Sequence, residues 1–393
     1  MNLREARKYT QMNIQAGNAT IIKSSPGMGK TDMAQHLAQW FGGQFGDQAR
    51  VGIATAFMAT QSSVGATGLP WKGELKVKNS QGEDVTFTVT DPAIPLWYIA
   101  TDLKTGERLP ACCFDKVILI LEEWGQGERE AKTAYAEVLL YGGTPPFYLP
   151  PGSARVALSN IDATDAVTKE FDFIINRRDE ITVTKDVDVW IEDFADRPYK
   201  FNGEEWSVMP VTKAWAKAKP EEFFADKPAK QGSWSTPRSV TMWDRFAQVA
   251  ARQNNGKVPI ENTGFVEASA GYIGMGAATS LFSHLQFLVE LPAYEQVIAD
   301  PTGCPVPKKA DFQMLMAYEL AHRTKPDGLS AVIQYLSRTD NNGRKEFPSD
   351  MSITYVSAML RRDYAGLINL PAMAAWVAKN ASLVSIIASL ASA

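Results

Sequence analysis

Along the first 185 residues, short continuous apolar runs alternate with longer segments in which apolar residues recur every three or four positions. A continuous run of β-branched and aliphatic residues is typical of a strand buried on both faces of a parallel sheet. Apolar residues three or four positions apart are typical of an amphipathic helix. The pattern predicts an α/β core, a parallel sheet between helices, over residues 1–185. The apolar runs are ATIIK (19–23), VGIATAFMAT (51–60), VILIL (117–121) and RVALSN (155–160), with helical segments at 31–42 and 128–143.

Two segments inside this core predict hairpins. Residues 72–92 read KGELKVKNSQGEDVTFTVTDP, in which two strand-like runs flank a polar turn at 79–84. A shorter hairpin is predicted near PFYLPPGS (146–153), directly before the apolar run at 155–160. Both are expected as inserts in the α/β core.

Beyond residue 185 the pattern becomes helical. Residues 186–234 form a connecting segment that is rich in Lys, Pro and Ala and is expected to be partly helical. Helical spacing then runs through 235–301, and again through a C-terminal helical region at 302–393. No repeat of solenoid period is evident.

Composition excludes several classes of protein. The chain has 393 residues, 45% hydrophobic and 21% charged, which is ordinary for a globular protein in water. A net charge of −4 gives no general attraction to nucleic acid or to an anionic membrane, although a local basic groove remains open. The three cysteines suit a reducing cytoplasm, where we expect the protein, and neither they nor the three scattered histidines have the spacing of a zinc site.

Neither end of the sequence predicts a membrane segment. The first twenty residues have no apolar signal core. The C-terminal SLVSIIASLASA (382–393) is apolar but too short to span a bilayer. We expect it to be a helix that packs on the body of the protein or on a neighbouring subunit.

Residues 24–31, SSPGMGKT, match the end of the phosphate-loop pattern and lie between a predicted strand and a predicted helix. In this context the backbone of Ser25, Pro26, Gly27, Met28 and Gly29 is expected to approach phosphate oxygens, with Lys30 on the β and γ phosphates and the Thr31 hydroxyl on Mg²⁺. Ser24 stands where the pattern has glycine. Because Ser24 lies at the exit of the strand, we expect it to matter little. The predicted ligands are ATP and Mg²⁺.

Two adjacent acids follow the apolar run at 117–121. Carboxylates at the carboxyl end of a parallel strand lie beside a phosphate loop in a sheet of this kind. We expect Glu122 to hold the Mg²⁺ shell and Glu123 to polarise the attacking water. Glu122 replaces the more usual aspartate, so its longer side chain must still reach the metal.

The order of these motifs resembles the MoxR group of AAA+ ATPases, which includes the CbbQ and NorQ type activators. The segment GLPWKGE (68–74), the hairpin insert, the paired acids and the polar end of RVALSN carry the resemblance, together with INRRDE (175–180) and STPRSVTMWDRF (235–246). The resemblance implies an AAA+ core, an all-helical lid at 235–301 and hydrolysis of ATP.

The resemblance also implies roles for four further residues. Asn160 matches sensor 1, which orients the lytic water. Arg177 and Arg178 are both candidates for an arginine finger that reaches the neighbouring subunit's nucleotide, with Arg177 favoured. Arg238 matches sensor 2; it follows the predicted cap Thr236 and Pro237, a poor place for a cation in the field of the helix. Each of these arginines also has an ordinary surface interpretation.

An arginine supplied by a neighbour requires a ring, which we expect to be a hexamer of this chain. By resemblance, such a ring remodels or activates a protein client, in some cases with a partner that carries a von Willebrand factor A domain. Two alternatives stay open. One is a nucleic-acid motor or loader, for which Lys72, Lys76 and Lys78 on the hairpin give thin support. The other is a nucleotide-gated scaffold that hydrolyses slowly, which the departures at Ser24 and Glu122 allow.

Overall fold

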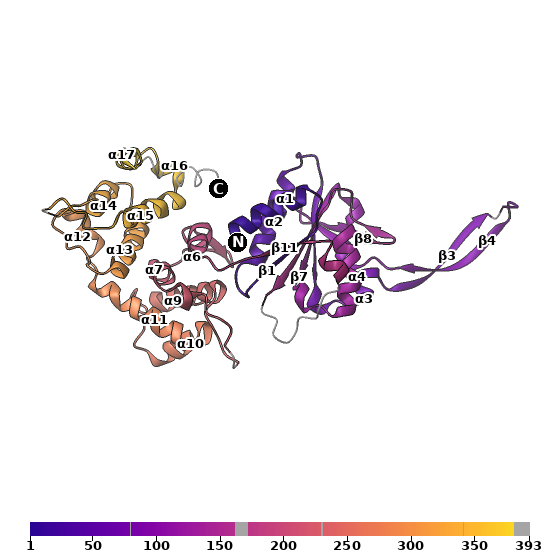
Figure 1. Ribbon diagram of the computed structural model, residues 1–393, viewed down its shortest axis with the longest axis horizontal. Helices are drawn as coiled ribbons and strands as arrows, with labels where there is room; N and C mark the ends of the chain where they lie inside the picture. The colour runs from indigo at the N-terminus through magenta and orange to yellow at the C-terminus, as the bar shows by residue number, and fades with distance from the viewer. Residues whose placement is uncertain (79, 162–171, 229–230, 341, 381–393) are drawn as a thin grey trace. The chain divides into compact units, whose positions relative to one another are not determined.

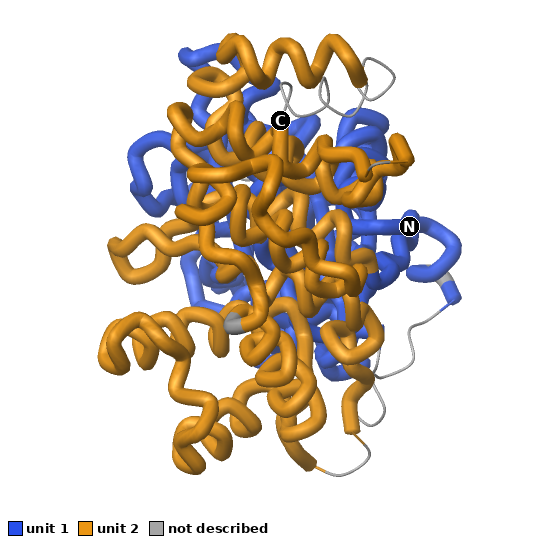
Figure 2. Tube along the Cα trace, turned by 90° about the vertical axis from the view of Figure 1, so that its left-hand side faces the viewer, with its two compact units in different colours: residues 1–185 blue, residues 186–393 orange. Residues whose placement is uncertain are grey.

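The computed structural model describes residues 1–78, 80–161, 172–228, 231–340 and 342–380. The chain divides into two compact units, residues 1–185 and residues 186–393, which are coloured separately in Figure 2. The helix expected at 382–393 lies outside the described residues. No helix in the described part of the chain combines the length and the hydropathy needed to cross a membrane.

The first unit contains a seven-stranded sheet in the order β11-β1-β10-β7-β2-β5-β6. The strands from β11 to β2 run parallel, and β5 and β6 extend the sheet antiparallel at one edge. This confirms the α/β class and the four strands predicted from apolar runs. The strands are β1 Thr20–Ser24, β2 Val51–Phe57, β5 Ile99–Asp102, β6 Arg108–Pro110, β7 Lys116–Glu122, β10 Ala154–Asn160 and β11 Asp179–Thr182.

Helices cover both faces of this sheet, as Figure 1 shows, with α1 Leu3–Gln15 and α2 Lys30–Gly43 on one side and α3 Ser63–Thr67 and α4 Arg129–Tyr141 on the other. The packing of strand β7 explains why its sequence is apolar at every position from 117 to 121. Its Ile118 packs in the core beneath α1 and α2, whereas the neighbouring Leu119 packs in the core beneath α4. Since successive side chains of a strand point to opposite faces, a strand covered on both sides must be apolar at every position.

The predicted long hairpin consists of β3 Pro70–Lys78 and β4 Asp84–Pro92, paired antiparallel along their whole length. Figure 1 shows it projecting from the sheet. Its side chains are largely open to solvent: Trp71 is 73% exposed and Leu75 is 49% exposed. The shorter hairpin is also present, as β8 Gly143–Thr144 and β9 Phe147–Tyr148.

The second unit is mainly helical, as predicted, but it contains one hairpin that the sequence pattern did not reveal, β12 Tyr199–Phe201 with β13 Glu204–Trp206. Its helix α9 begins as expected, because the Thr236 side chain caps the backbone and Pro237 occupies the first turn. The helices are α6 Val187–Trp190, the π-helical turn η5 Ile191–Ala195, α7 Pro210–Ala218, α8 Pro220–Phe223, α9 Pro237–Gln253, α10 Thr263–Ile273, α11 Met275–Phe287, α12 Tyr294–Ala299, α13 Ala310–Arg323, α14 Leu329–Leu336, α15 Ser349–Arg362, α16 Tyr364–Leu367 and α17 Pro371–Lys379.

Candidate functional site

The loop between β1 and α2 has the backbone geometry of an anion cradle. Gly27 and Gly29 adopt φ values of 75° and 89°, in the left-handed region that favours glycine. Gly29 is the N-cap residue of α2 and has no side chain to cap the helix. The first amides of α2 therefore lack a capping side chain, and an anion at the helix N-terminus would satisfy them. The predicted cradle residues Ser25, Pro26 and Met28 lie in the same turn.

Lys30, the first residue of α2, is held by acceptors from two strands. Its Nζ donates to the Ser24 and Ser25 carbonyl oxygens, each at 3.1 Å, and to the Ser24 hydroxyl at 2.8 Å. It also donates to Asn160 Oδ1 at 2.8 Å, across 130 residues of sequence. The structure thus brings together the loop lysine and the predicted sensor asparagine.

Ser24 differs from the sequence expectation. It is fully buried at the end of β1, and its hydroxyl both accepts from Lys30 and donates to the Ser25 carbonyl at 3.0 Å. The sequence predicts little influence of this residue on phosphate binding, because it lies at the exit of the strand. The Ser24 hydroxyl, which a glycine would lack, helps to position Lys30. This role depends on a three-dimensional contact that the sequence pattern does not show.

Strand order explains why these groups meet. β10 lies between β1 and β7, and its register places Asn160 beside Ser24 and Ala157 beside Leu121. Because parallel strands end on the same edge, the ends of β1, β10 and β7 share that edge of the sheet. Glu122 is the last residue of β7 and is 8% exposed.

Glu123 follows Glu122 directly but has a different environment. It is exposed, and its φ of 55° is rare for a residue other than glycine. Such a backbone costs on the order of 1–3 kcal/mol and persists where the surroundings impose it, often at functional sites. The left-handed turn separates the two acids: Glu122 stays within the sheet, whereas Glu123 begins the turn Trp124–Gln126 at the sheet edge.

Lys132 supports this turn and was not anticipated from the sequence. It lies on α4, is 1% exposed, and donates from Nζ to the Gly125 carbonyl oxygen at 2.9 Å. The signal in the sequence is a lysine among residues of the apolar face of α4, next to Ala131 and one turn before Tyr135 and Ala136. A buried lysine at that position is expected to hold the backbone that follows Glu123.

The donor set fits a phosphate group with its cation. The cradle supplies backbone N–H groups and Lys30, and Thr31, the second residue of α2, is exposed. Thr31 and Glu122 are the side chains that would hold Mg²⁺, an ion that usually takes few protein ligands and keeps several waters. Among the residues that the structure describes, no group of three or more His, Cys, Asp or Glu side chains forms a metal site.

The two candidate finger arginines precede β11 and differ in environment. Arg177 is exposed and donates to the Tyr141 hydroxyl at 2.8 Å. The Arg178 side chain is 2% exposed and forms an ion pair with Glu180 at 2.7 Å, and Glu180 also pairs with Lys23 at 3.0 Å. Desolvation acts to raise the pKa of Glu180, but hydrogen bonds from Lys23 and Arg178 outweigh it and hold this pKa below its ordinary value. Arg178 is therefore held at its own sheet edge, whereas Arg177 is exposed to solvent; the role of either as an arginine finger stays a prediction.

Arg238 lies in the second unit, exposed in the first turn of α9. The loop lies in the first unit. Contact between Arg238 and a nucleotide on the loop therefore stays a prediction.

No family model and no curated protein matches the chain. Several solved structures resemble it weakly, including the two that follow. A protein described as a candidate ATPase from Cytophaga hutchinsonii ATCC 33406 shares 12% identity over 69% of this chain and 80% of that one, with a TM-score of 0.30. NtrX from Brucella abortus shares 10% identity over 91% of this chain and 68% of that one, with a TM-score of 0.28.

Proposed function

We propose that this chain is an ATP hydrolase of the AAA+ type. The observation that carries the proposal is the bond between Lys30 at the N-terminus of α2 and Asn160 at the end of β10, beside the paired acids that end β7. Phosphoryl transfer to water requires groups of this kind at one sheet edge: a glycine-bearing turn between a strand and a helix, a lysine, a polar residue at a strand end and two carboxylates.

Each side chain has a separate task in this proposal. Loop amides and Lys30 bind the β and γ phosphates, exchanging present acceptors of Lys30 for phosphate oxygens. Thr31 and Glu122 hold Mg²⁺, which neutralises charge on the phosphates. Asn160 orients the attacking water, and Glu123, exposed at the start of the turn after β7, polarises it.

The assembly part of the proposal is a hexameric ring. Its support is the exposure of Arg177, which contrasts with the burial of Arg178 in its own subunit. An arginine from a neighbouring subunit would stabilise charge on the transferred phosphoryl group. In such a ring Arg238 would contact the γ phosphate from the lid.

The client part of the proposal is MoxR-like: the ring couples ATP turnover to remodelling or activation of a protein, with a von Willebrand factor A domain protein as a candidate partner. The projecting hairpin β3–β4 supports a protein client, because exposed apolar side chains such as Trp71 and Leu75 mark contact surfaces. The competing candidate is a nucleotide-gated scaffold with slow turnover.

The deciding experiment compares Lys30→Ala with Lys23→Ala, a matched loss of one positive charge seven residues earlier. Equilibrium binding of ATP with Mg²⁺ and release of phosphate are measured for both variants and for the wild type. Lys30→Ala should lose tight binding and turnover, whereas Lys23→Ala should keep both. Wild-type affinity in Lys30→Ala would exclude the loop as the site, and tight binding without turnover by the wild type would favour the scaffold.

A further inference from the structure

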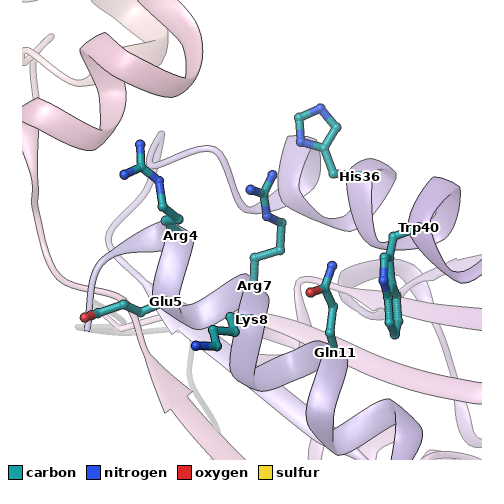
Figure 3. A pocket seen from close by; sticks show the side chains of 7 residues that line it. All are labelled: Arg4, Glu5, Arg7, Lys8, Gln11, His36 and Trp40. Atoms are coloured by element: carbon teal, nitrogen blue, oxygen red, sulfur yellow. The ribbon is translucent and has the colours of Figure 1, made fainter. Parts of the chain in front are cut away.

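A second candidate site lies on the outer surface of α1 and α2. Four residues of α1, at positions 4, 7, 8 and 11, share one helix face, because residues three and four apart are neighbours on a helix. Two residues of α2, at positions 36 and 40, face them by the same rule. Together they line a cavity of about 340 Å³, shown in Figure 3; its lining is Arg4, Glu5, Arg7, Lys8, Gln11, His36 and Trp40.

The charge in this groove is strongly one-sided although the whole chain carries −4. Three cations line it against one carboxylate, and that carboxylate, Glu5, accepts from the Asn2 backbone N–H at 3.1 Å as part of the helix cap. In the described part of the chain, Arg7 and Lys8 form no ion pair. The positive charge of these two side chains is therefore not compensated by an ion pair in the described part of the chain.

This arrangement is unfavourable for α1 by itself. Arg4 lies in the first turn, where the helix macrodipole disfavours a cation, and the last turn of α1 carries no basic residue. Arg4 also has a like charge three residues on at Arg7 and four residues on at Lys8, a pairing that destabilises a helix. An anion bound beside Arg7 and Lys8 would relieve the repulsion between these like charges.

Trp40 adds a flat ring to this basic surface. It is partly buried, because one part of it packs against the core beneath α1 and α2, and its side chain also lines the groove. Gln11 contributes an amide that can donate and accept hydrogen bonds. Cations for phosphate and an anchored aromatic ring for a base are the two elements of a nucleotide-binding surface.

The Trp40 end of the groove is distant from the phosphate loop. Trp40 follows Lys30 by ten residues on the same helix, which corresponds to about 15 Å along its axis. The other end of the groove is nearer to the loop, because the Leu3 side chain lies close to Gly29. A base on Trp40 is therefore distant from the phosphates of a nucleotide on the loop.

We propose that the α1–α2 groove binds a nucleotide unit, with its phosphate on Arg7 and Lys8 and its base on Trp40. The unit can come from a free nucleotide or from a single strand of nucleic acid. A strand continues past the groove and brings several phosphates within reach of Arg4, Arg7 and Lys8, which a free nucleotide does not.

The test measures fluorescence anisotropy of a labelled dT20 strand with the full chain, without ATP, over a range of salt concentrations. The double variant Arg7→Gln/Lys8→Gln should bind at least about tenfold more weakly, and the slope of log affinity against log salt should fall by about 1.4, since each phosphate contact on a single strand contributes about 0.7. The matched control, Lys72→Gln/Lys76→Gln on the hairpin, removes the same charge and should bind as the wild type does. Equal losses in both double variants would overturn the site.

Trp40→Phe tests the ring while keeping an aromatic side chain in the core. It should weaken dT20 binding and leave the salt slope unchanged, because stacking releases no counterions. A Trp40→Phe variant with normal thermal unfolding and unchanged affinity would overturn the role of the ring.

Two further titrations identify the source. AMP is titrated into Lys30→Ala, with and without the Arg7→Gln/Lys8→Gln change, to exclude the phosphate loop. Binding of AMP that depends on Arg7 and Lys8 supports a free nucleotide, and binding of dT20 alone supports a strand. Absence of both, or displacement of dT20 by poly-glutamate as readily as by unlabelled dT20, would overturn the nucleotide assignment. None of these outcomes depends on ATP hydrolysis.

Discussion

The polar groups at the sheet edge of the first unit and those between the helices of the second unit are placed in opposite ways. In the first unit, Lys30 and Asn160 are partly exposed and Glu123 is exposed, at the edge where the parallel strands end. In the second unit, Asp196 is almost fully buried, and its two carboxylate oxygens accept from Lys213 at 3.0 Å and from Arg361 at 2.8 Å. The first arrangement leaves polar groups accessible to a ligand, whereas the second uses them to join helices.

Asp244 extends the contrast. It is fully buried in α9 and accepts from the Met209 backbone N–H at 3.1 Å, from the Thr212 hydroxyl at 2.5 Å and from Gln248 Nε2 at 2.6 Å. Burial raises the pKa of this carboxyl to about 6, against the opposing effect of those hydrogen bonds. A perturbed pKa therefore marks a structural group here, and the candidate catalytic acids of the first unit are recognised by position instead.

The largest expected effect on activity is at the two arginines before β11, where the exposed Arg177 and the buried Arg178 can be compared. In the proposed ring Arg177 acts on a neighbour's nucleotide, so Arg177→Ala should bind ATP normally but lose turnover by a factor on the order of 10³. Co-expression with Lys30→Ala should restore activity, since some interfaces then combine an intact loop with an intact arginine. Phosphate release by the mixed ring, with its mass measured in a slowly hydrolysed ATP analogue, is the readout.

The buried Arg178 serves as the matched control for Arg177. Arg178→Ala should lower the thermal stability of the first unit, because Glu180 then loses a partner, and co-expression with Lys30→Ala should not restore turnover. If co-expression with Lys30→Ala restored the activity of Arg178→Ala and not that of Arg177→Ala, Arg178 would be the arginine finger. A strictly monomeric chain with full turnover would exclude the finger altogether.

The next largest effect is expected at the two adjacent acids, Glu122 and Glu123. Glu123→Gln should bind ATP with Mg²⁺ and lower turnover by about 10² or more, because an amide cannot take up the proton of the attacking water. Glu122→Gln should mainly raise the Mg²⁺ concentration needed for tight ATP binding. Turnover and Mg²⁺ titrations of both variants separate the roles, and the reverse pattern would show that the assignments must be exchanged.

In the second unit, the expected effect is on stability. Asp196→Ala leaves Lys213 and Arg361 buried with fewer partners, so the free energy of unfolding of this unit should fall by about 3–5 kcal/mol. Denaturant unfolding measures it, with the exposed Glu221→Ala as the control, expected to change little. A loss of ATP affinity in folded Asp196→Ala would contradict the separation of structural from ligand-facing charges.

The smallest expected effect is a pH dependence at Asp244. Its folded pKa of about 6 lies above the ordinary value of 3.8, so the folded state binds a proton that the unfolded state has released between these pH values. Its contribution to stability is therefore complete below pH 3.8 and is lost as the pH rises through 6, by on the order of 3 kcal/mol. The unfolding free energy of the wild type minus that of Asp244→Asn should fall across this window. A constant difference would show that Asp244 titrates normally.

Several parts of the fold were predictable because they depend on local pattern. The continuous apolar run 117–121 is typical of a strand that is covered on both faces. The Thr236–Pro237 pair is typical of the first residues of a helix. The long hairpin followed from two alternating runs and a polar turn. The hairpin β12–β13 escaped because its strands are three residues each, too short to show a period.

For the candidate site, the sequence determined which chemical groups are present and the local elements that carry them: a glycine turn before a helix, two acids after a strand and an asparagine ending another. Only the tertiary structure decided which of these groups meet. The order of β1, β10 and β7 brings Asn160 to Lys30, the buried Ser24 hydroxyl becomes an acceptor, and Lys132 comes to hold the turn after Glu123. Such contacts depend on strand order and on packing between distant segments, and neither is encoded by the period or composition of any single segment.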